Sequence, residues 1–188
     1  LMEALNNNGV KAKMLVRDKE TDQITVVGLK QSLMRQWGFL WERSVVFWHL
    51  HFSKKHLFEI DIANCGTDIT RMREFKEADV IHLHWINQGF ISLKIVRKIL
   101  DSGKPVVWTM HDIWPATGIC HYTRGCKHFK TRCYSCQLLP GKGGETDLAY
   151  KTWEAKRRML KGQNIHFVTC SRWLEGEARQ SALLAGQQ

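Results

Sequence analysis

Apolar and polar positions follow strand-like and helix-like periods in turn through the second half of the chain. Short apolar runs at residues 80–86, 105–111 and 164–169 are typical of strands buried in a parallel sheet. Apolar side chains recur at helical spacing in residues 90–100 and again in 147–161. This order predicts an α/β fold, a Rossmann-like parallel sheet with helices on both faces.

Capping residues mark where these elements begin and end. We expect Asn87 to cap the helix over 90–100, and Gly103 to end that helix. Pro105 then opens the next strand, and Ser171 is a good N-cap for a last helix.

The first half of the chain has a weaker pattern. Residues 1–5 have the spacing of the last turns of an amphipathic helix, which Gly9 ends as a left-handed cap. We expect a strand at 10–17 and a short second strand or hairpin arm at 24–28. Residues 31–58 hold seven Trp and Phe side chains and predict one or two helices.

Two of the predicted strands end on histidines. With the two-residue period of a strand, His82 and His84 share one face of strand 80–86, and the next strand ends at His111 and Asp112. Open α/β sheets hold their ligands at the carboxyl edge of the strands. We interpret His82 as a hydrogen-bonded core residue, and His84 as a functional residue. His111 is a candidate general base or ligand for phosphate and hydroxyl groups, and Asp112 orients an imidazole, binds sugar hydroxyls or caps a turn. The structural alternative for the last two is a buried hydrogen-bonded pair.

Four cysteines gather in one cysteine-rich loop, which we place at residues 118–140. They are Cys120, Cys126, Cys133 and Cys136. The last two form a Cys-x-x-Cys pair, as in tetrahedral thiolate sites, and a loop of this length needs such a staple. We therefore predict a structural zinc ion, with His121 or His128 able to replace one thiolate. Two disulfides or four free thiols are the alternatives.

The chain is basic. Its 188 residues carry a formal net charge of +10, which favours anionic partners such as phosphates, anionic lipid surfaces or nucleic acid. Basic residues at 156–158 and 161 share a predicted helix, where either anion binding or ordinary solvation explains them. The sequence contains no run of eighteen apolar residues, and six cysteines without a secretory signal pattern favour the cytoplasm.

Residues 35–55 combine Trp and Phe with Lys and Arg. This mixture is typical of a membrane interface, where the chain would contact an anionic membrane or an acceptor. Burial of the same aromatic side chains in the core explains the pattern equally well, so both interpretations stay open.

Three segments carry a resemblance to a known family. They read EADVIHLHWINQGFISLK from residue 77, GKPVVWTMHDIWPATGICHYTRGCKHFKTRCYSC from 103 and VTCSRWLEGEARQSALL from 168. Together they resemble the N-terminal domain of a family 4 glycosyltransferase of the two-Rossmann-domain type, in the bacterial capsule and exopolysaccharide branch. The resemblance is dense from Glu77 onward and weak over residues 18–66.

The resemblance implies an enzyme of the hexosyltransferase type. Such an enzyme moves a sugar from a nucleotide-sugar to a glycan or lipid-linked acceptor in cell-surface polysaccharide synthesis. It implies that His111 is a catalytic residue near the donor sugar and the reacting hydroxyl, and that His84, Trp85 and Asp112 shape the acceptor pocket. It also implies a cytoplasmic protein, peripheral at the inner face of the membrane.

The same resemblance sets the expected domain organisation. Residues 1–188 would form one acceptor-side domain, inactive alone, cut from a longer protein. The first strand with its glycine-rich loop and the C-terminal domain, which binds most of the nucleotide-sugar, would lie outside these residues.

Two other functions compete with this one. A basic, zinc-stapled domain that binds nucleic acid would fit the charge and the cysteines, but the α/β pattern shows no recognition helix, so we expect no nucleic-acid partner. Another two-domain nucleotide-sugar enzyme, such as an epimerase, would turn over the donor sugar without an acceptor.

Overall fold

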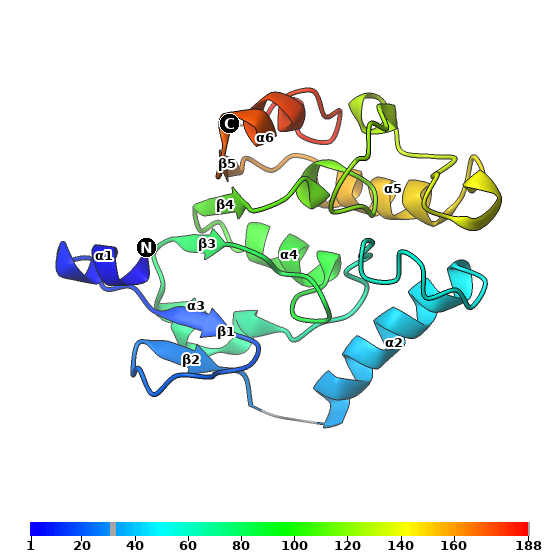
Figure 1. Ribbon diagram of the computed structural model, residues 1–188. Helices are drawn as coiled ribbons and strands as arrows, with labels where there is room; N and C mark the ends of the chain where they lie inside the picture. Colours follow the sequence, from blue (N-terminus) through cyan, green and yellow to red (C-terminus); the bar gives the residue numbers. More distant parts are fainter. Residues whose placement is uncertain (31–32, 188) are drawn as a thin grey trace.

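The computed structural model describes residues 1–30 and 33–187, and its fold is α/β and Rossmann-like (Figure 1). In this part of the chain the strands form two parallel sheets flanked by helices. The smaller sheet pairs β1 (Met14–Val16) with β2 (Val26–Gly28). The larger sheet has the order β3 (Ile81–Leu83), β4 (Val106–Met110), β5 (His166–Thr169). The predicted fold class is thereby confirmed.

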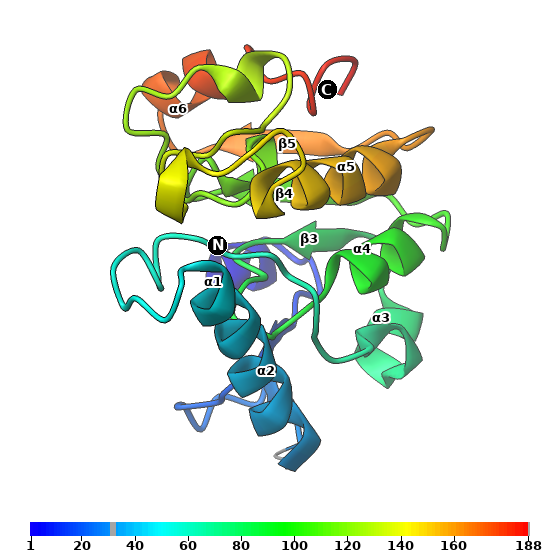
Figure 2. The ribbon, with the colours of Figure 1, turned by 90° about the vertical axis from the view of Figure 1, so that its right-hand side faces the viewer.

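The helices of the described residues connect and cover these strands. They are α1 (Met2–Asn7), α2 (Leu33–His49), α3 (Arg73–Glu77), α4 (Leu93–Leu100), α5 (Leu148–Leu160) and α6 (Arg172–Ala178), with short 3-10 turns η1 (Ile69–Arg71), η2 (Trp114–Ala116), η3 (His128–Lys130) and η4 (Pro140–Lys142). Figure 2 shows α4 and α5 side by side along the larger sheet. Among the described residues, no helix combines the length and apolar composition needed to cross a membrane.

The helix after β3 begins later than predicted. Its N-cap is Ser92, whose hydroxyl accepts a hydrogen bond from the Ile95 backbone N–H at 3.3 Å, and not Asn87. The reason is the backbone at Gln88 and Gly89, where φ is 56° and 73°, because a right-handed helix cannot continue through positive φ.

The other capping predictions of the second half hold. Gly103 has φ of 74° just after α4, and β4 begins directly after Pro105. The Ser171 hydroxyl accepts from the Leu174 backbone N–H at 3.2 Å and caps α6.

The N-terminal elements are shorter or differently paired than predicted. Gly9 follows α1 with φ of 80°, as a left-handed cap should. The strand β1 covers only part of 10–17, and β2 runs parallel to it, so β2 is not a hairpin arm. A single helix, α2, accounts for the described helical part of 31–58.

The larger sheet has one well-buried face. Ile81 and Leu83 of β3 and Val106 and Trp108 of β4 lie in a common core with residues of α4 and α5. On the opposite face His82 is exposed. The interpretation of His82 as a core residue was therefore wrong.

Candidate functional site

The parallel register of β3 and β4 brings three histidines together. His82 lies opposite Val107, so the carboxyl ends of the two parallel strands lie at one edge of the sheet, where side chains of one face can meet. A hydrogen bond of 3.0 Å joins Nδ1 of His84 to Nε2 of His111, and the His82 and His84 rings stack with centroids 4.3 Å apart. His82 Nε2 also bonds the Thr109 hydroxyl at 2.7 Å. The structure thus places His84 and His111, which the sequence puts on separate strands, in direct contact.

The electrostatics of this cluster favour the neutral forms of His82 and His84. Burial, followed by the neighbouring His111, lowers the pKa of His82. Burial, followed by His82 and His111, likewise lowers the pKa of His84. In the bond between His84 and His111, one ring nitrogen donates its proton and the other accepts it. Among the described residues none bonds Nδ1 of His111, so this nitrogen of an exposed side chain is free for a ligand.

Asp112 turns away from the histidine cluster. Its Oδ1 accepts from the Trp114 backbone N–H, and its Oδ2 lies against His121 Nδ1, both at 2.8 Å. Burial by itself would raise the pKa of Asp112, but the hydrogen bond and the charge of His121 outweigh it and hold that pKa below its ordinary value. Asp112 therefore orients an imidazole and caps a turn, but the imidazole belongs to His121.

Trp85 joins this second group rather than the histidine cluster. Its ring centroid lies 5.9 Å from that of His121, and 44% of Trp85 is exposed. His121 also stacks on Trp114, with ring centroids 6.4 Å apart. The predicted acceptor residues thus divide: His84 pairs with the predicted catalytic residue His111, whereas Trp85 and Asp112 both lie against His121.

Lys156 is a residue of this region that sequence reasoning placed wrongly, among basic side chains of a helix surface. It is 1% exposed on α5, and its Nζ donates to the backbone carbonyls of Trp114 at 2.6 Å and Thr117 at 3.0 Å. Burial lowers its pKa to about 7. The ammonium also lies 3.3 Å from the centroid of the Trp114 ring, so α5 holds the turn that follows β4.

Helical spacing was the signal that could have located Lys156. It lies three residues after Trp153 and four before Leu160, and both of those apolar side chains are buried. A lysine in the middle of an apolar stripe belongs to the inner face of its helix. The run of basic residues favoured a surface position for Lys156, because Arg157 and Arg158 follow it directly and do face outward.

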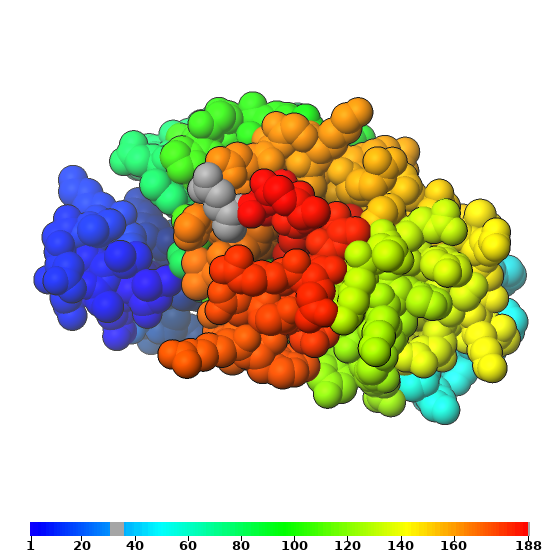
Figure 3. All heavy atoms as spheres, turned by 90° about the horizontal axis from the view of Figure 1, so that it is seen from above, coloured from blue at the N-terminus to red at the C-terminus, as the bar shows by residue number. Residues whose placement is uncertain are grey.

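The cysteine-rich loop, residues 118–140, is described throughout and contains η3 and the start of η4. All four of its cysteines line one cavity of about 20 Å³, and Cys133 Sγ accepts from the Gly118 backbone N–H at 3.1 Å. Burial raises the pKa values of Cys133 and Cys136 to about 12. Figure 3 shows the segment after α6 lying against this loop, where Ala182 N–H donates to the Phe129 carbonyl at 3.2 Å.

The thiols are free, so the disulfide alternative was wrong. Within the described residues, no group of three or more His, Cys, Asp or Glu side chains is arranged to hold a metal ion. The four sulfur atoms share a cavity without converging on one point. The structural zinc ion stays a prediction.

Comparison with known proteins gives one partial relative. The chain is 32% identical over 89 residues to a protein of Escherichia coli (strain K12) named "Putative colanic acid biosynthesis glycosyl transferase WcaC". The match covers 44% of this chain and 22% of that relative. No protein-family model and no solved structure matches the chain. The similarity supports a glycosyltransferase relationship in general terms.

Proposed function

We propose that this chain is the acceptor-side domain of a glycosyltransferase of the hexosyltransferase type. The enzyme would transfer a sugar from a nucleotide-sugar to a glycan or lipid-linked acceptor. The observation that carries the proposal is the His84–His111 pair at the carboxyl edge of β3 and β4, in a chain whose partial relative is named a glycosyl transferase. That relative's name refers to colanic acid biosynthesis, and we propose a role in cell-surface polysaccharide synthesis for this chain.

The proposed reaction needs an acceptor hydroxyl held beside the donor sugar. The bond between the anomeric carbon and the diphosphate breaks and its electrons leave with the diphosphate. The acceptor oxygen forms the new bond to that carbon, and its proton passes to a diphosphate oxygen. His111 is the group we assign to orient and polarise the reacting hydroxyl, because its Nδ1 is free while Nε2 is fixed by His84.

The second group completes the proposed acceptor pocket. Trp85 offers a partly exposed indole ring beside His121, and Asp112 holds that imidazole in place. Most of the nucleotide-sugar would be bound by a second domain, outside these residues. The cations and helix N-termini that stabilise the departing diphosphate would lie between the two domains.

Substitution of His111 tests this proposal in the longer protein that we expect to contain the chain. We expect His111→Asn to reduce the rate of sugar transfer by about 100-fold, the scale of one general acid–base or polarising group. His166→Asn is the matched control, because His166 is exposed on the neighbouring strand β5 and is not part of the pair. Transfer at the parent rate by His111→Asn, with the control also unchanged, would remove His111 from the mechanism.

A further inference from the structure

The outer side of α2 carries large apolar side chains. We define the aromatic face as Trp37, Leu40, Trp41 and Trp48 of α2, with Phe52 just after the helix. The three tryptophans are 68%, 63% and 66% exposed. Their spacing places them along one side of the helix. Exposed apolar groups collected on one face indicate a binding surface, whereas scattered ones do not.

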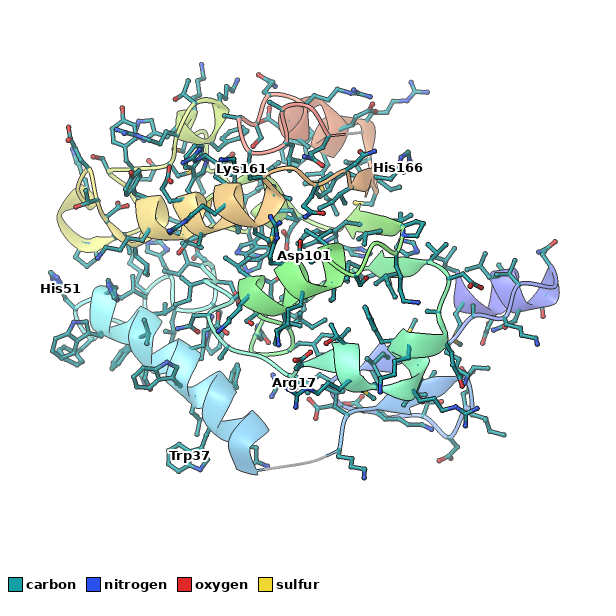
Figure 4. The ribbon with its side chains drawn as sticks, turned by 180° about the vertical axis from the view of Figure 1, so that it is seen from behind. Arg17, Trp37, His51, Asp101, Lys161 and His166 are labelled. Carbon is teal, nitrogen blue, oxygen red and sulfur yellow. The ribbon has the colours of Figure 1, made fainter. Side chains whose placement is uncertain are left out.

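The inner side of α2 carries two buried charged residues beside the buried apolar side chain of Val46. Glu42 is fully buried, and its carboxylate accepts from the backbone N–H groups of Ile62 and Ala63 at 3.2 and 2.9 Å. Arg43 is buried beside it and contacts the Asp61 carboxylate at 3.2 Å. Rotating α2 to bury its tryptophans would break these bonds and leave the buried Asp61 carboxylate without Arg43, which is strongly unfavourable. Figure 4 shows the resulting arrangement, with Trp37 pointing away from the body of the molecule.

Basic residues flank the aromatic face along the chain. Glu42 is the only acidic residue between positions 31 and 58, and it faces inward. Lys54 and Lys55 follow the helix and are exposed, and Lys30 is exposed before it. An apolar strip with lysines at both ends matches a surface that has negative charge outside and hydrocarbon beneath.

We propose that the aromatic face binds the surface of an anionic lipid bilayer, with α2 lying in the plane of the membrane. Tryptophan favours the interface, since its ring is apolar while its N–H can bond water or headgroups. The helix lies on the membrane rather than across it, because its buried Glu42 and Arg43 face the protein. A protein partner would bury the indoles equally well, but anionic lipid also accounts for the lysines at both ends.

Asp61 connects this surface to the candidate site. Its carboxylate accepts from the Gln88 backbone N–H at 3.0 Å, in the segment after β3. Its backbone carbonyl accepts from Trp114 Nε1 at 2.8 Å, in the turn after β4. Docking through α2 would therefore hold both strand ends at a set distance from the bilayer, which suits a lipid-linked acceptor. Only this last step rests on the proposed function, because membrane binding itself needs no donor and no acceptor.

Vesicle co-sedimentation of the chain tests the inference. We expect it to sediment with vesicles of one part phosphatidylglycerol to one part phosphatidylcholine, to bind pure phosphatidylcholine more weakly, and to release the anionic vesicles as salt rises. Replacing Trp37, Trp41 and Trp48 together by Gln should weaken binding by about tenfold or more, since the apolar contact area is lost. Trp173→Gln is the matched control, because Trp173 is 57% exposed on α6, away from this face, and its loss should leave binding unchanged.

A single substitution, Leu40→Glu, guards against misfolding of the triple variant. It places one negative charge on an exposed position of the same face and should also weaken binding to anionic vesicles, with an unchanged circular dichroism spectrum. Equal binding by the parent and the triple variant would overturn the proposal, as would no binding by the parent. The proposal would also fail if the aromatic face instead held two copies together, seen as a concentration-dependent dimer that the triple variant loses. If the chain binds vesicles but the longer protein transfers no sugar, only the proposed function is contradicted.

Discussion

Glu42 shows at the scale of one residue how the inner side of α2 is held. Burial, followed by the negative charge of Asp61, raises its pKa to about 7, although Arg43 partly opposes the shift. In the unfolded chain this carboxyl titrates near its ordinary pKa of 4.5. The folded state therefore binds more protons between these two values. Stability from Glu42 is fully present below pH 4.5 and is lost as pH rises through about 7.

Glu42→Gln should remove this pH dependence. Gln keeps an oxygen that can accept from the Ile62 and Ala63 backbone N–H groups but carries no charge. We expect the free energy of unfolding of the variant minus that of the parent to increase as pH rises from 5 to 8, because only the parent loses stability when Glu42 ionises. Urea unfolding at several pH values measures it, and Glu20→Gln, at an exposed position, is the control. A difference between variant and parent that stays constant across this pH range would contradict the assignment.

Among the elements, the cysteine-rich loop contains no α-helix and no strand, and it depends on its neighbours. The segment after α6 contacts it through Ala182, and the Ser181 hydroxyl donates to the Ala116 carbonyl at 2.6 Å just before it. Its four thiols share one cavity. Metal binding in such a loop would add directly to folding stability.

A zinc ion in this loop would be visible in the purified chain. We expect about one zinc per chain by elemental analysis, in keeping with a four-thiolate site. Replacing Cys133 and Cys136 by Ser should abolish zinc binding and lower the melting temperature by several degrees, because metal-linked stability is lost. Cys170→Ser, at an exposed position outside the loop, should change neither. A metal-free chain whose melting temperature is unaffected by a chelator would rule out the zinc site.

The elements differ in how well their sequence pattern predicts them. For β4 and α5 the apolar run and the helical spacing each match the observed bounds closely, because local periodicity and burial agree there. For α2 the pattern predicts a helix but not which side faces inward. That choice depends on Asp61 and on the backbone N–H groups of Ile62 and Ala63, which are distant in sequence.

At the scale of the whole molecule, the open carboxyl edge of β3 and β4 fits a domain that works against a second one. Nucleotide-sugars should therefore raise the melting temperature of the longer protein but leave this chain unchanged. Ligand at roughly 100 times its Kd stabilises the bound state by about 2.7 kcal/mol, which corresponds to several degrees. Thermal-shift measurements with UDP- and GDP-sugars on both proteins make the comparison. An equal shift in the chain alone would place the donor site within residues 1–188, and turnover of the donor without an acceptor would favour an epimerase.

The sequence by itself determined the α/β class, the order of strands and helices after residue 80, and the histidines at the strand ends. These follow from local periodicity, capping residues and the rule that parallel strands end at one edge. Only the tertiary structure decided that His84 bonds His111, that Asp112 orients His121 and that the tryptophans of α2 face outward. Each of these depends on partners far apart in sequence, whose pairing is set by strand register and by the cost of leaving a buried charge or polar group without a partner.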